Sequence, residues 1–352
     1  MHYHLIGSRG SSLSGIAAML RTEGHQVTET DATTTGHGAD KLPIKLDRVI
    51  FSEAITPGSA GWPELEAARS RGVMTLRRIE FIAERMVGHT GIAVAGAHGK
   101  STTTALIGWI LTEAGEDPTV FIGAELSVFG GSARSGRGRF VVAEACEWNK
   151  QFLTLHPNVL VMTTIDREHL DTYPGGESEI IQAFHEAAMN IQPNGFIVAN
   201  HDNDLVRRAL IGVDRSIHWV GRSMEATYRL VSIQTRPAGE LEAKLLVNGQ
   251  SVELISFLVG EHHAFNLVSA FAVANVLQLD RQIVLKSITN FPGLKRRFER
   301  YREDKILTIV DDYAHHPTEI AVTITAARQR YPGIRILVVF QPHLSERTTD
   351  LF

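Results

Sequence analysis

The chain has 352 residues, of which 43% are hydrophobic and 21% are charged, the balance of an ordinary globular protein. Its formal charge of −4 argues against a broad basic surface for nucleic acid, and no apolar run is long enough to span a membrane. The one cysteine, Cys146, excludes an intramolecular disulfide and a cysteine-rich zinc site, which favours a reducing cytoplasm. The length exceeds what one core usually holds, so we expect about two or three domains.

Short β-branched runs alternate with amphipathic stretches along the chain, a pattern typical of α/β folds with parallel sheets. We predict strands at 4–6, 49–52, 92–95, 140–143, 159–165, 306–310 and 335–340. We predict helices at 13–23 and 318–330, and a further helix directly after the strand at 92–95. The stretch 222–258 alternates apolar and polar residues around Asn248-Gly249, which predicts an antiparallel hairpin.

The sharpest motif is the run Gly96-Ala-His-Gly-Lys-Ser-Thr102, which follows an apolar strand and precedes a helix. In such a turn the backbone N–H groups approach phosphates closely, and the helix N-terminus favours the anion. Lys100 is placed to reach the terminal phosphates, and Ser101 to ligate Mg²⁺. Valine stands at position 94, where the strict phosphate-loop pattern has a glycine.

Acidic and imidazole groups follow the next two predicted strands. These residues are Glu144 and Glu147 after the first strand, and Asp166, Glu168, His169 and Asp171 after the second. Ligands gather at the carboxyl ends of strands in open α/β sheets, and Mg²⁺ prefers oxygen ligands. For any one of these acids a solvated loop charge is the alternative, but their joint position favours a site.

Three further segments carry charged or polar groups near predicted strand ends. They are 295–299 with its basic cluster, 311–319 with its acids and histidines, and 341–343 with the nearby Arg347. A basic cluster can stabilise a transferring phosphoryl group, although a charged linker is an equal alternative. Pro317 is suited to open a helix, and the titratable groups before it would face the ligand side of the sheet.

A glycine-rich turn, Gly7 to Gly15, follows the first predicted strand, and Asp31 closes the next apparent strand. This placement indicates a nucleotide-sugar or dinucleotide turn, with a plain strand–helix turn as the alternative. The dinucleotide pattern fails because Arg9 and Ser12 replace two of its glycines.

In this order the motifs resemble those of the Mur ligases, the ligases of peptidoglycan precursor synthesis. The segments that carry the resemblance are 95–104, 144–147, 164–173, 260–266, 293–298, 311–319 and 341–343. The similarity covers nearly the whole chain. Segment 311–319 followed by 341–343 is specific to the branch that joins L-alanine to UDP-N-acetylmuramate. Other Mur ligases and folylpolyglutamate synthases share the phosphate loop but not that segment.

The resemblance implies a Rossmann-like UDP-sugar-binding domain at 1–88, a central P-loop ATPase domain at 89–300 and an incomplete Rossmann-like C-terminal domain at 301–352. It implies that ATP phosphorylates the carboxylate of UDP-N-acetylmuramate and that L-alanine attacks the acyl phosphate. A free carboxylate is a poor acyl donor, so the protein supplies positioning and charge neutralisation. The implied cofactors are ATP and Mg²⁺, and the implied state is a monomer or homodimer.

The resemblance also implies roles for individual residues. The implied catalytic residues are Lys100, Glu144, His169, Arg297 and His315. The implied nucleotide contacts are Gly96, Ala97, His98, Gly99, Lys100, Ser101, Thr102, Asn266, Arg297, Asp312 and Tyr313. The implied magnesium ligands are Ser101, Glu144 and His169. The implied substrate contacts are Gly7, Gly10, Ser14, Asp31, Ser52, Arg134 and Arg347, the last as a grip on the carboxylate of the amino acid.

The sequence departs from the Mur pattern in several places. The stretch between Asp31 and Asp47 is short, so we expect a helix of the first domain to be missing. His263 replaces the first asparagine of a pair whose second member is Asn266, and Leu344 replaces an arginine beside the amino-acid site. The amine acceptor is therefore less defined than the type of reaction.

Three alternatives stay open at this stage. A murein peptide ligase would join a recycled tripeptide to the same sugar. An NAD-dependent oxidoreductase fits the first glycine turn, but hydride transfer has no need of Lys100. A nucleotide-binding relic without full activity fits the substitution at Leu344. The third block of the chain, which begins near Lys305, has few predicted elements. We therefore expect the chain to be a fragment or a natural truncation that binds ATP and ligates poorly.

Overall fold

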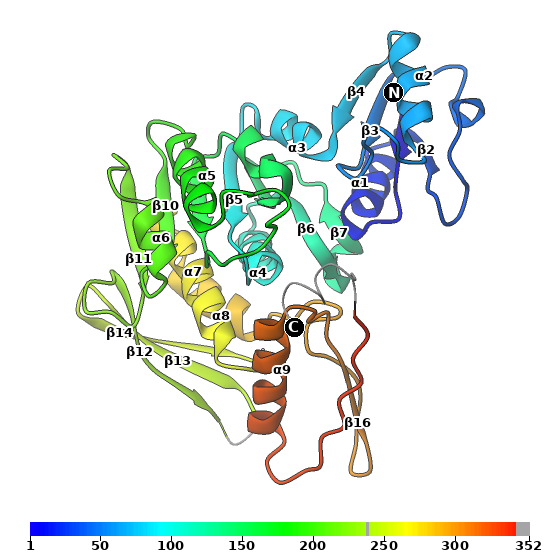
Figure 1. Cartoon of the computed structure of the whole chain (residues 1–352). Coiled ribbons are helices and arrows are strands. Elements are labelled where there is room, and N and C mark those ends of the chain that lie inside the picture. The colour runs from blue at the N-terminus through cyan, green and yellow to red at the C-terminus, as the bar shows by residue number, and fades with distance from the viewer. Residues whose placement is uncertain (237–238, 343–352) are drawn as a thin grey trace.

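Three β-sheets follow one another along the chain, with the first at the upper right of Figure 1 and the third at the bottom. This computed structural model describes residues 1–236 and 239–342. In that part of the chain, no helix has both the length and the apolar composition needed to cross a membrane. The alternation of strands and helices confirms the predicted α/β class.

The first sheet has parallel strands in the order β2-β1-β3-β4. Its elements are β1 (His2–Ile6), α1 (Ser11–Thr22), β2 (Gln26–Thr30), η1 (Ala39–Lys41), β3 (Arg48–Phe51), α2 (Trp62–Ser70) and β4 (Met74–Arg77). Leu5 and Ile50 pack with α1 on one face, while Ile6 and Phe51 pack with α2 on the other. Because both faces are covered, the central strands β1 and β3 are buried continuously after their first residue rather than at every second position.

The central sheet has the strand order β14-β13-β12-β11-β10-β9-β5-β8-β6-β7. Its strands are β5 (Thr90–Ala95), β6 (Thr119–Leu126), β7 (Gly131–Arg134), β8 (Phe140–Glu144), β9 (Val159–Met162), β10 (Phe196–Asn200), β11 (Ser216–Gly221), β12 (Tyr228–Thr235), β13 (Leu241–Val247) and β14 (Gln250–Ser256). The strands between β12 and β6 in this order run parallel to their neighbours. Strand β7 pairs antiparallel with β6, β13 with β12, and β14 with β13. Pairing of β13 with β14 around Asn248 and Gly249 confirms the predicted hairpin.

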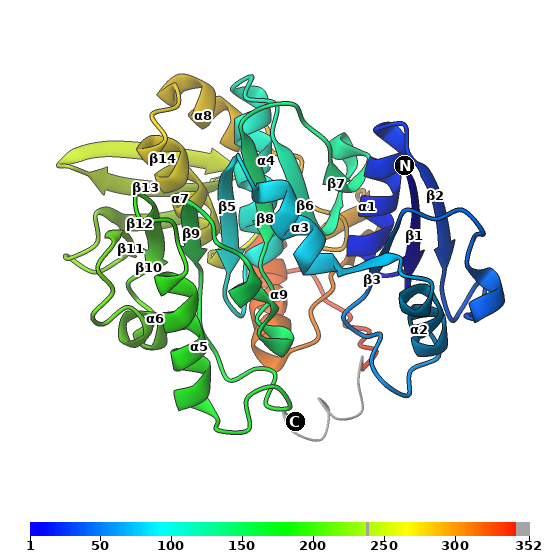
Figure 2. The same ribbon diagram turned by 90° about the horizontal axis from the view of Figure 1, so that it is seen from above.

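Helices cover both faces of the central sheet (Figure 2). They are α3 (Arg78–Met86), α4 (Lys100–Glu113), α5 (Glu177–Met189), α6 (Asp204–Ala209), α7 (His262–Val276) and α8 (Arg281–Thr289), with short turns η2 (Ser127–Phe129) and η3 (Trp148–Thr154). Helices α4, α7 and α8 share one core, and α3, α5 and α6 share the other. Helix α1 packs on the second core beside β7, where a Cβ on Gly15 would lie 2.3 Å from Oγ of Ser132. The first block therefore rests on an edge of the central sheet.

The third block consists of β15 (Glu299–Glu303), β16 (Thr308–Asp311) and α9 (Pro317–Arg330). A small core of Val259, Phe298 and Ala326 joins it to the central block. Pro317 stands at the start of α9, as predicted, because its missing N–H is not needed in the first turn. This block carries His315 and His316 to the edge of the central sheet.

The third block departs from the prediction at two strands, of which one is displaced and one is not formed. The strand expected at 306–310 begins at Thr308, because the Asp304 carboxylate accepts the N–H groups of Ile306 and Leu307 and forms a turn. This strand pairs antiparallel with β15, not parallel with 335–340. The stretch 335–340 has no neighbouring strand in the described part of the chain and forms none.

Candidate nucleotide and metal site

The phosphate loop lies between β5 and α4, where the sequence predicts it. Gly99 has φ of +83° and Gly96 has φ of +133°, and both values favour glycine. A Cβ on Gly99 would lie 2.4 Å from Oδ1 of Asn266, so a side chain at this position would require the Asn266 amide to move. Helix α4 begins at Lys100, and its first N–H groups point toward the space where an anion would bind.

The neighbouring strand supports this loop. Strand β9 ends at Met162, three residues before the predicted end, because the next two residues turn toward the loop. The backbone N–H of Ala97 donates to the carbonyl of Thr164 at 2.6 Å, and the hydroxyl of Thr163 donates to the carbonyl of His98 at 2.6 Å. These two hydrogen bonds hold the backbone of the loop in an open conformation that leaves space for a phosphate.

The Lys100 ammonium lies folded against its own loop. It donates to the carbonyl of Ala97 at 2.9 Å and to Oε1 of Glu147 at 3.1 Å. Burial disfavours the charge, but Glu147 and other nearby acids outweigh it and raise the pKa of Lys100 above its usual value. The lysine is therefore a fixed cation at the centre of the site.

A cluster of oxygen and nitrogen donors surrounds this lysine. Glu147, Glu168 and His169 each offer one atom within 4.8 Å of the others. Glu147 is buried, and its Oε2 has no hydrogen-bond partner in the described structure. His169 adopts φ of +53°, a conformation that a histidine rarely takes without a reason. Glu144 lines the same space and accepts the N–H of Gly123 at 2.6 Å.

The linker and the third block close over the loop from the other side. Arg297 and Arg296 both lie over the ring of Tyr313, at 5.8 and 4.7 Å from its centroid. Asp312 accepts the N–H groups of Phe298 and Ala314, at 2.7 and 2.8 Å, and so ties the linker to β16. Burial is the largest influence on Asp312 and raises its pKa.

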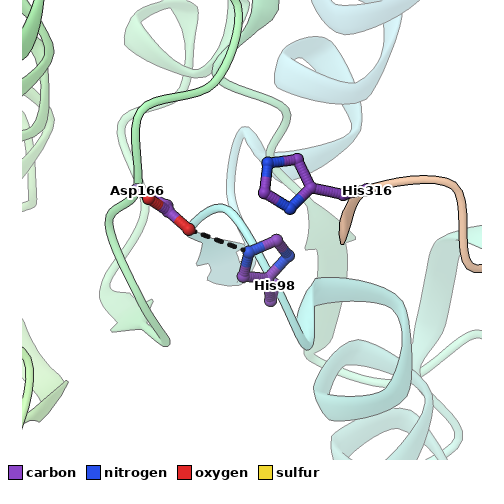
Figure 3. Close-up of side chains that lie close together, drawn as sticks. All are labelled: His98, Asp166 and His316. Atoms are coloured by element: carbon purple, nitrogen blue, oxygen red, sulfur yellow. Dashed lines mark hydrogen bonds and ion pairs between the residues drawn. The ribbon is translucent and has the colours of Figure 1, made fainter. Parts of the chain in front are cut away.

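His98 projects from the phosphate loop toward α9. Its Nε2 lies 3.3 Å from Oδ2 of Asp166, and its Nδ1 lies 3.5 Å from Oε1 of Glu319 and 3.9 Å from Oε1 of Glu168. Burial opposes a charge on His98, but these carboxylates outweigh it and raise its pKa to about 9. Figure 3 shows that His316, from the start of α9, faces the same ring. The phosphate loop and the third block thus meet through charged pairs.

Two adjacent histidines at the start of α7 are held neutral. Burial lowers the pKa of His262 to about 4 and that of His263 well below its usual value, and the nearby Arg297 lowers both further. His263 lies 3.1 Å from the side-chain nitrogen of Asn266. The histidine that replaces a family asparagine therefore orients the remaining Asn266 toward the loop.

Many of these groups border one cavity of about 510 Å³, whereas Glu147, Asp166 and His316 are not part of its lining. The predicted site residues that line it are Ala97, His98, Gly99, Lys100, Ser101, Thr102, Glu144, His169, Asn266, Arg297, Asp312, Tyr313 and His315. Gly96 forms the turn behind them. The structure thus gathers residues that are more than 200 positions apart in the chain into one space.

The predicted substrate contacts of the first block lie at the carboxyl ends of its strands. Gly7 donates its N–H to Thr30, and a Cβ on Gly7 would lie 3.1 Å from Cβ of Ser52. Asp31 accepts the N–H of Arg9 at 3.1 Å, so the backbone beside Arg9 closes the turn. Gly10 precedes α1, and Ser14 lies within it.

Two predicted substrate contacts lie elsewhere. Arg134 on β7 donates to Oδ1 of Asp117 at 2.6 Å and to the carbonyl of Pro118. Its guanidinium is therefore held by the central block. Arg347 lies outside the described residues, as do His343 and Leu344.

The sequence reasoning missed several groups of the structure. The sequence places Glu319 and His316 only in a titratable segment, because their contacts with His98 have no local signal. The sequence also gives no sign of a buried carboxylate–histidine cluster under the first sheet. In this cluster Glu64 lies 2.7 Å from His4 and 3.0 Å from His37. These partners are far apart in sequence, so no motif reveals them.

The parallel sheet, the glycine turn before α4 and the buried lysine define a nucleotide-binding protein of the P-loop class. Residues 94–274 match the Mur ligase middle domain, and residues 296–351 match the Mur ligase glutamate ligase domain. The chain belongs to the Mur ligase family.

Relatives agree with this assignment. A UDP-N-acetylmuramate–L-alanine ligase of Methylobacillus flagellatus is 38% identical over all of this chain and 78% of its own length. The structure of a UDP-N-acetylmuramate–alanine ligase of Thermotoga maritima matches 97% of this chain and 81% of that chain, with a TM-score of 0.85 and 27% identity. A murein peptide ligase of Psychrobacter arcticus, 23% identical, covers 95% of this chain and 77% of its own with a TM-score of 0.76, and so shows the fold alone.

Proposed function

We propose that this chain is an ATP-dependent ligase that joins L-alanine to the carboxylate of UDP-N-acetylmuramate. One observation carries the chemistry: a lysine, two carboxylates, a histidine and an arginine border one cavity at the glycine turn before α4, and they are Lys100, Glu144, Glu168, His169 and Arg297. The relatives that share this site over the full chain, at 35–39% identity, bear the name of that ligase. The reaction needs the site to hold a nucleotide and an activated acyl group side by side.

Nucleotide binding falls to the loop and to α4. The N–H groups after Gly99 would receive phosphate oxygens, and Lys100 would exchange its carbonyl partners for the terminal phosphates. The close approach of Asn266 to the loop supports its proposed role in holding the nucleotide. Transfer of the phosphoryl group then depends on charge neutralisation, which Lys100 and Arg297 would supply from opposite sides.

The donor set beside Lys100 fits Mg²⁺. Glu147 offers a buried carboxylate oxygen without a partner, and Glu168 and His169 lie within reach of it. Ser101 and Glu144 line the same space. Bound there, Mg²⁺ would neutralise the charge that develops on the phosphate oxygens. We propose Glu147 and Glu168 as ligands in addition to the predicted Glu144 and His169.

The acyl phosphate and the amine would meet under the third block. His315 lines the cavity, and its backbone N–H donates to Oε2 of Glu319 at 3.2 Å, which fixes its position. We infer that this end of the cavity shields the acyl phosphate from water while L-alanine attacks. We place the reaction in the cytoplasm and expect a monomer or homodimer.

Phosphate release with UDP-N-acetylmuramate and ATP tests the proposal. L-alanine should stimulate release far more than the recycled tripeptide, which is the substrate of the second candidate, a murein peptide ligase. Lys100→Ala should lose at least about 100-fold of the rate. Lys150→Ala is the matched control, because that lysine pairs with Glu179 at the surface and should change little.

The outcomes separate the alternatives. Stimulation by tripeptide and not by L-alanine would assign the chain to the second candidate. ATP binding without turnover by either amine would indicate a nucleotide-binding relic. Binding of NADH in place of ATP would contradict the ligase assignment.

A further inference from the structure

A second cluster of metal-binding side chains lies beside the phosphate loop, outside the groups assigned above to Mg²⁺. It consists of His98 on the loop, Asp166 on the segment after β9 and His316 at the start of α9. Each offers one ligand atom within 4.8 Å of the other two. In Figure 3 the two imidazoles face one another, and the Asp166 carboxylate points at His98.

The spacing suits a small ion. Two ligand atoms about 2.0 Å from a tetrahedral zinc ion lie about 3.3 Å apart. Nε2 of His98 and Oδ2 of Asp166 are 3.3 Å apart, so this pair already has that separation. The rings of His98 and His316 have centroids 5.4 Å apart and are tilted by 51°. Rotation of the His316 side chain is enough to bring its donor nitrogen toward the same point.

The charges around the cluster favour a cation. Glu319 and Glu168 lie 3.5 and 3.9 Å from Nδ1 of His98, on the side of the ring opposite Asp166. Three carboxylates thus surround one imidazole. Negative charge gathered at this point favours a bound cation, and an ion on Nε2 of His98 would take the place of a proton there.

We propose that His98, Asp166 and His316 form a site for a transition-metal ion such as Zn²⁺ or Co²⁺, separate from the Mg²⁺ site. Two imidazoles and one carboxylate are the donors that these ions prefer, whereas Mg²⁺ takes oxygen ligands. The other cluster, Glu147, Glu168 and His169, is rich in carboxylates and has one imidazole. The two sites therefore differ in the ion that they select.

The surroundings provide the support that metal-binding histidines require. When Nε2 of His98 binds the ion, its Nδ1–H faces Glu319, the arrangement that orients a ligating imidazole. That Nδ1 is buried and has no hydrogen-bond partner in the described structure. His316 uses its lone pair to accept a long bond of 3.3 Å from the N–H of Thr318. Ligation through Nδ1 would replace that single bond, whereas ligation through Nε2 would leave it in place.

An ion at this point links the phosphate loop directly to α9. His98 belongs to the loop that holds phosphate, whereas His316 belongs to the block that carries His315. Occupation of the site therefore holds the third block against the central block. Transition-metal binding should protect α9 from proteolysis, an effect that does not depend on ligase activity.

Co²⁺ titration of the full chain in excess Mg²⁺ tests the site. We expect one equivalent of Co²⁺ to bind, with the intense visible absorption of a four- or five-coordinate ion. Asp166→Asn and His316→Ala should each weaken this binding by about tenfold or more, since loss of outer-shell support alone costs at least that much. His316 caps the first turn of α9, so its replacement can disturb that helix. The Asp166→Asn variant keeps the cap and therefore tests the site independently. His201→Ala is the matched control, because His201 pairs with Glu225 at 3.2 Å without a second imidazole.

Two results would overturn the proposal. One is Co²⁺ binding that excess Mg²⁺ displaces, since the ion then occupies the carboxylate-rich cluster. The other is binding that Asp166→Asn and His316→Ala leave unchanged. Both results are independent of L-alanine turnover, so failure of this proposal differs from failure of the ligase assignment.

Discussion

Glutamine in place of Glu319 removes the charge that joins the third block to the phosphate loop. The Glu319 carboxylate is 19% exposed and meets Nδ1 of His98 at 3.5 Å. Burial alone would raise the pKa of Glu319, but His98, Arg297 and His315 outweigh it and hold the pKa well below its usual range. We predict that Glu319→Gln loosens α9 from the central block.

The size of the expected loss of stability follows from the pKa shift of His98. Its pKa rises from 6.5 to about 9, which corresponds to a net stabilisation of about 3 kcal/mol from its carboxylate partners after the opposing effect of burial. Glu319 is one of three such partners, with Asp166 and Glu168, so its share is about 1 kcal/mol. That free energy changes the opening equilibrium of α9 about fivefold.

The sign of the pH dependence is fixed by the same shift. Because the folded pKa of His98 is raised, the contact is fully stabilised below about pH 6.5 and weakens as the pH rises through about 9. In Glu319→Gln the weakening should occur at a lower pH, because one stabilising charge is absent. Below the usual pKa of Glu319, protonation of this carboxylate also weakens the contact in the unmodified chain.

Amide hydrogen exchange of α9 in the presence of EDTA measures the effect. Protection of 317–330 should fall about fivefold in Glu319→Gln, with α5 unchanged. Glu125→Gln is the control, since Glu125 forms a surface pair with Lys295 at 2.9 Å. Combination with His98→Gln should add little to the single change. Equal protection of α9 in Glu319→Gln and the unmodified chain, or fully additive effects, would refute the reasoning.

Three further predictions concern other parts of the chain. Gly99→Ala should abolish ATP binding by calorimetry with circular dichroism unchanged, because a Cβ there meets Asn266 at 2.4 Å; normal affinity would contradict this. Glu64→Gln should lower the free energy of unfolding, measured in urea, by about 3 kcal/mol, because His4 and His37 lose the carboxylate that they contact. A change under about 0.5 kcal/mol would show that these contacts do not stabilise the fold. Removal of Mg²⁺ by EDTA should stop phosphate release and Mg²⁺ should restore it, whereas persistent release would exclude the proposed metal cluster.

Local chemistry explains what the sequence predicted well. A glycine-rich turn before a helix depends on a few adjacent residues, so 96–102 predicted the turn between β5 and α4 directly. The hairpin at Asn248 and Gly249 is likewise set by the turn between two alternating strands. The strands at 92–95 and 140–143 are apolar runs, and helices cover both faces of the sheet around them.

Where the prediction failed, the missing information was in distant partners. The stretch 335–340 has the composition of a strand, but a strand forms only beside another strand, and the described structure supplies none. Strand β16 lies beside β15 because a turn at Asp304 folds the chain back on itself.

The sequence by itself determined the class of protein, the phosphate loop and the set of groups suited to phosphoryl transfer, because each depends on residues close together in the chain. Only the tertiary structure decided which of those groups meet. It paired Lys100 with Glu147 and placed His98 between Asp166 and Glu319. Such contacts arise from the packing of the three blocks, since charges that lie far apart in sequence interact only when folding brings them within a few ångströms.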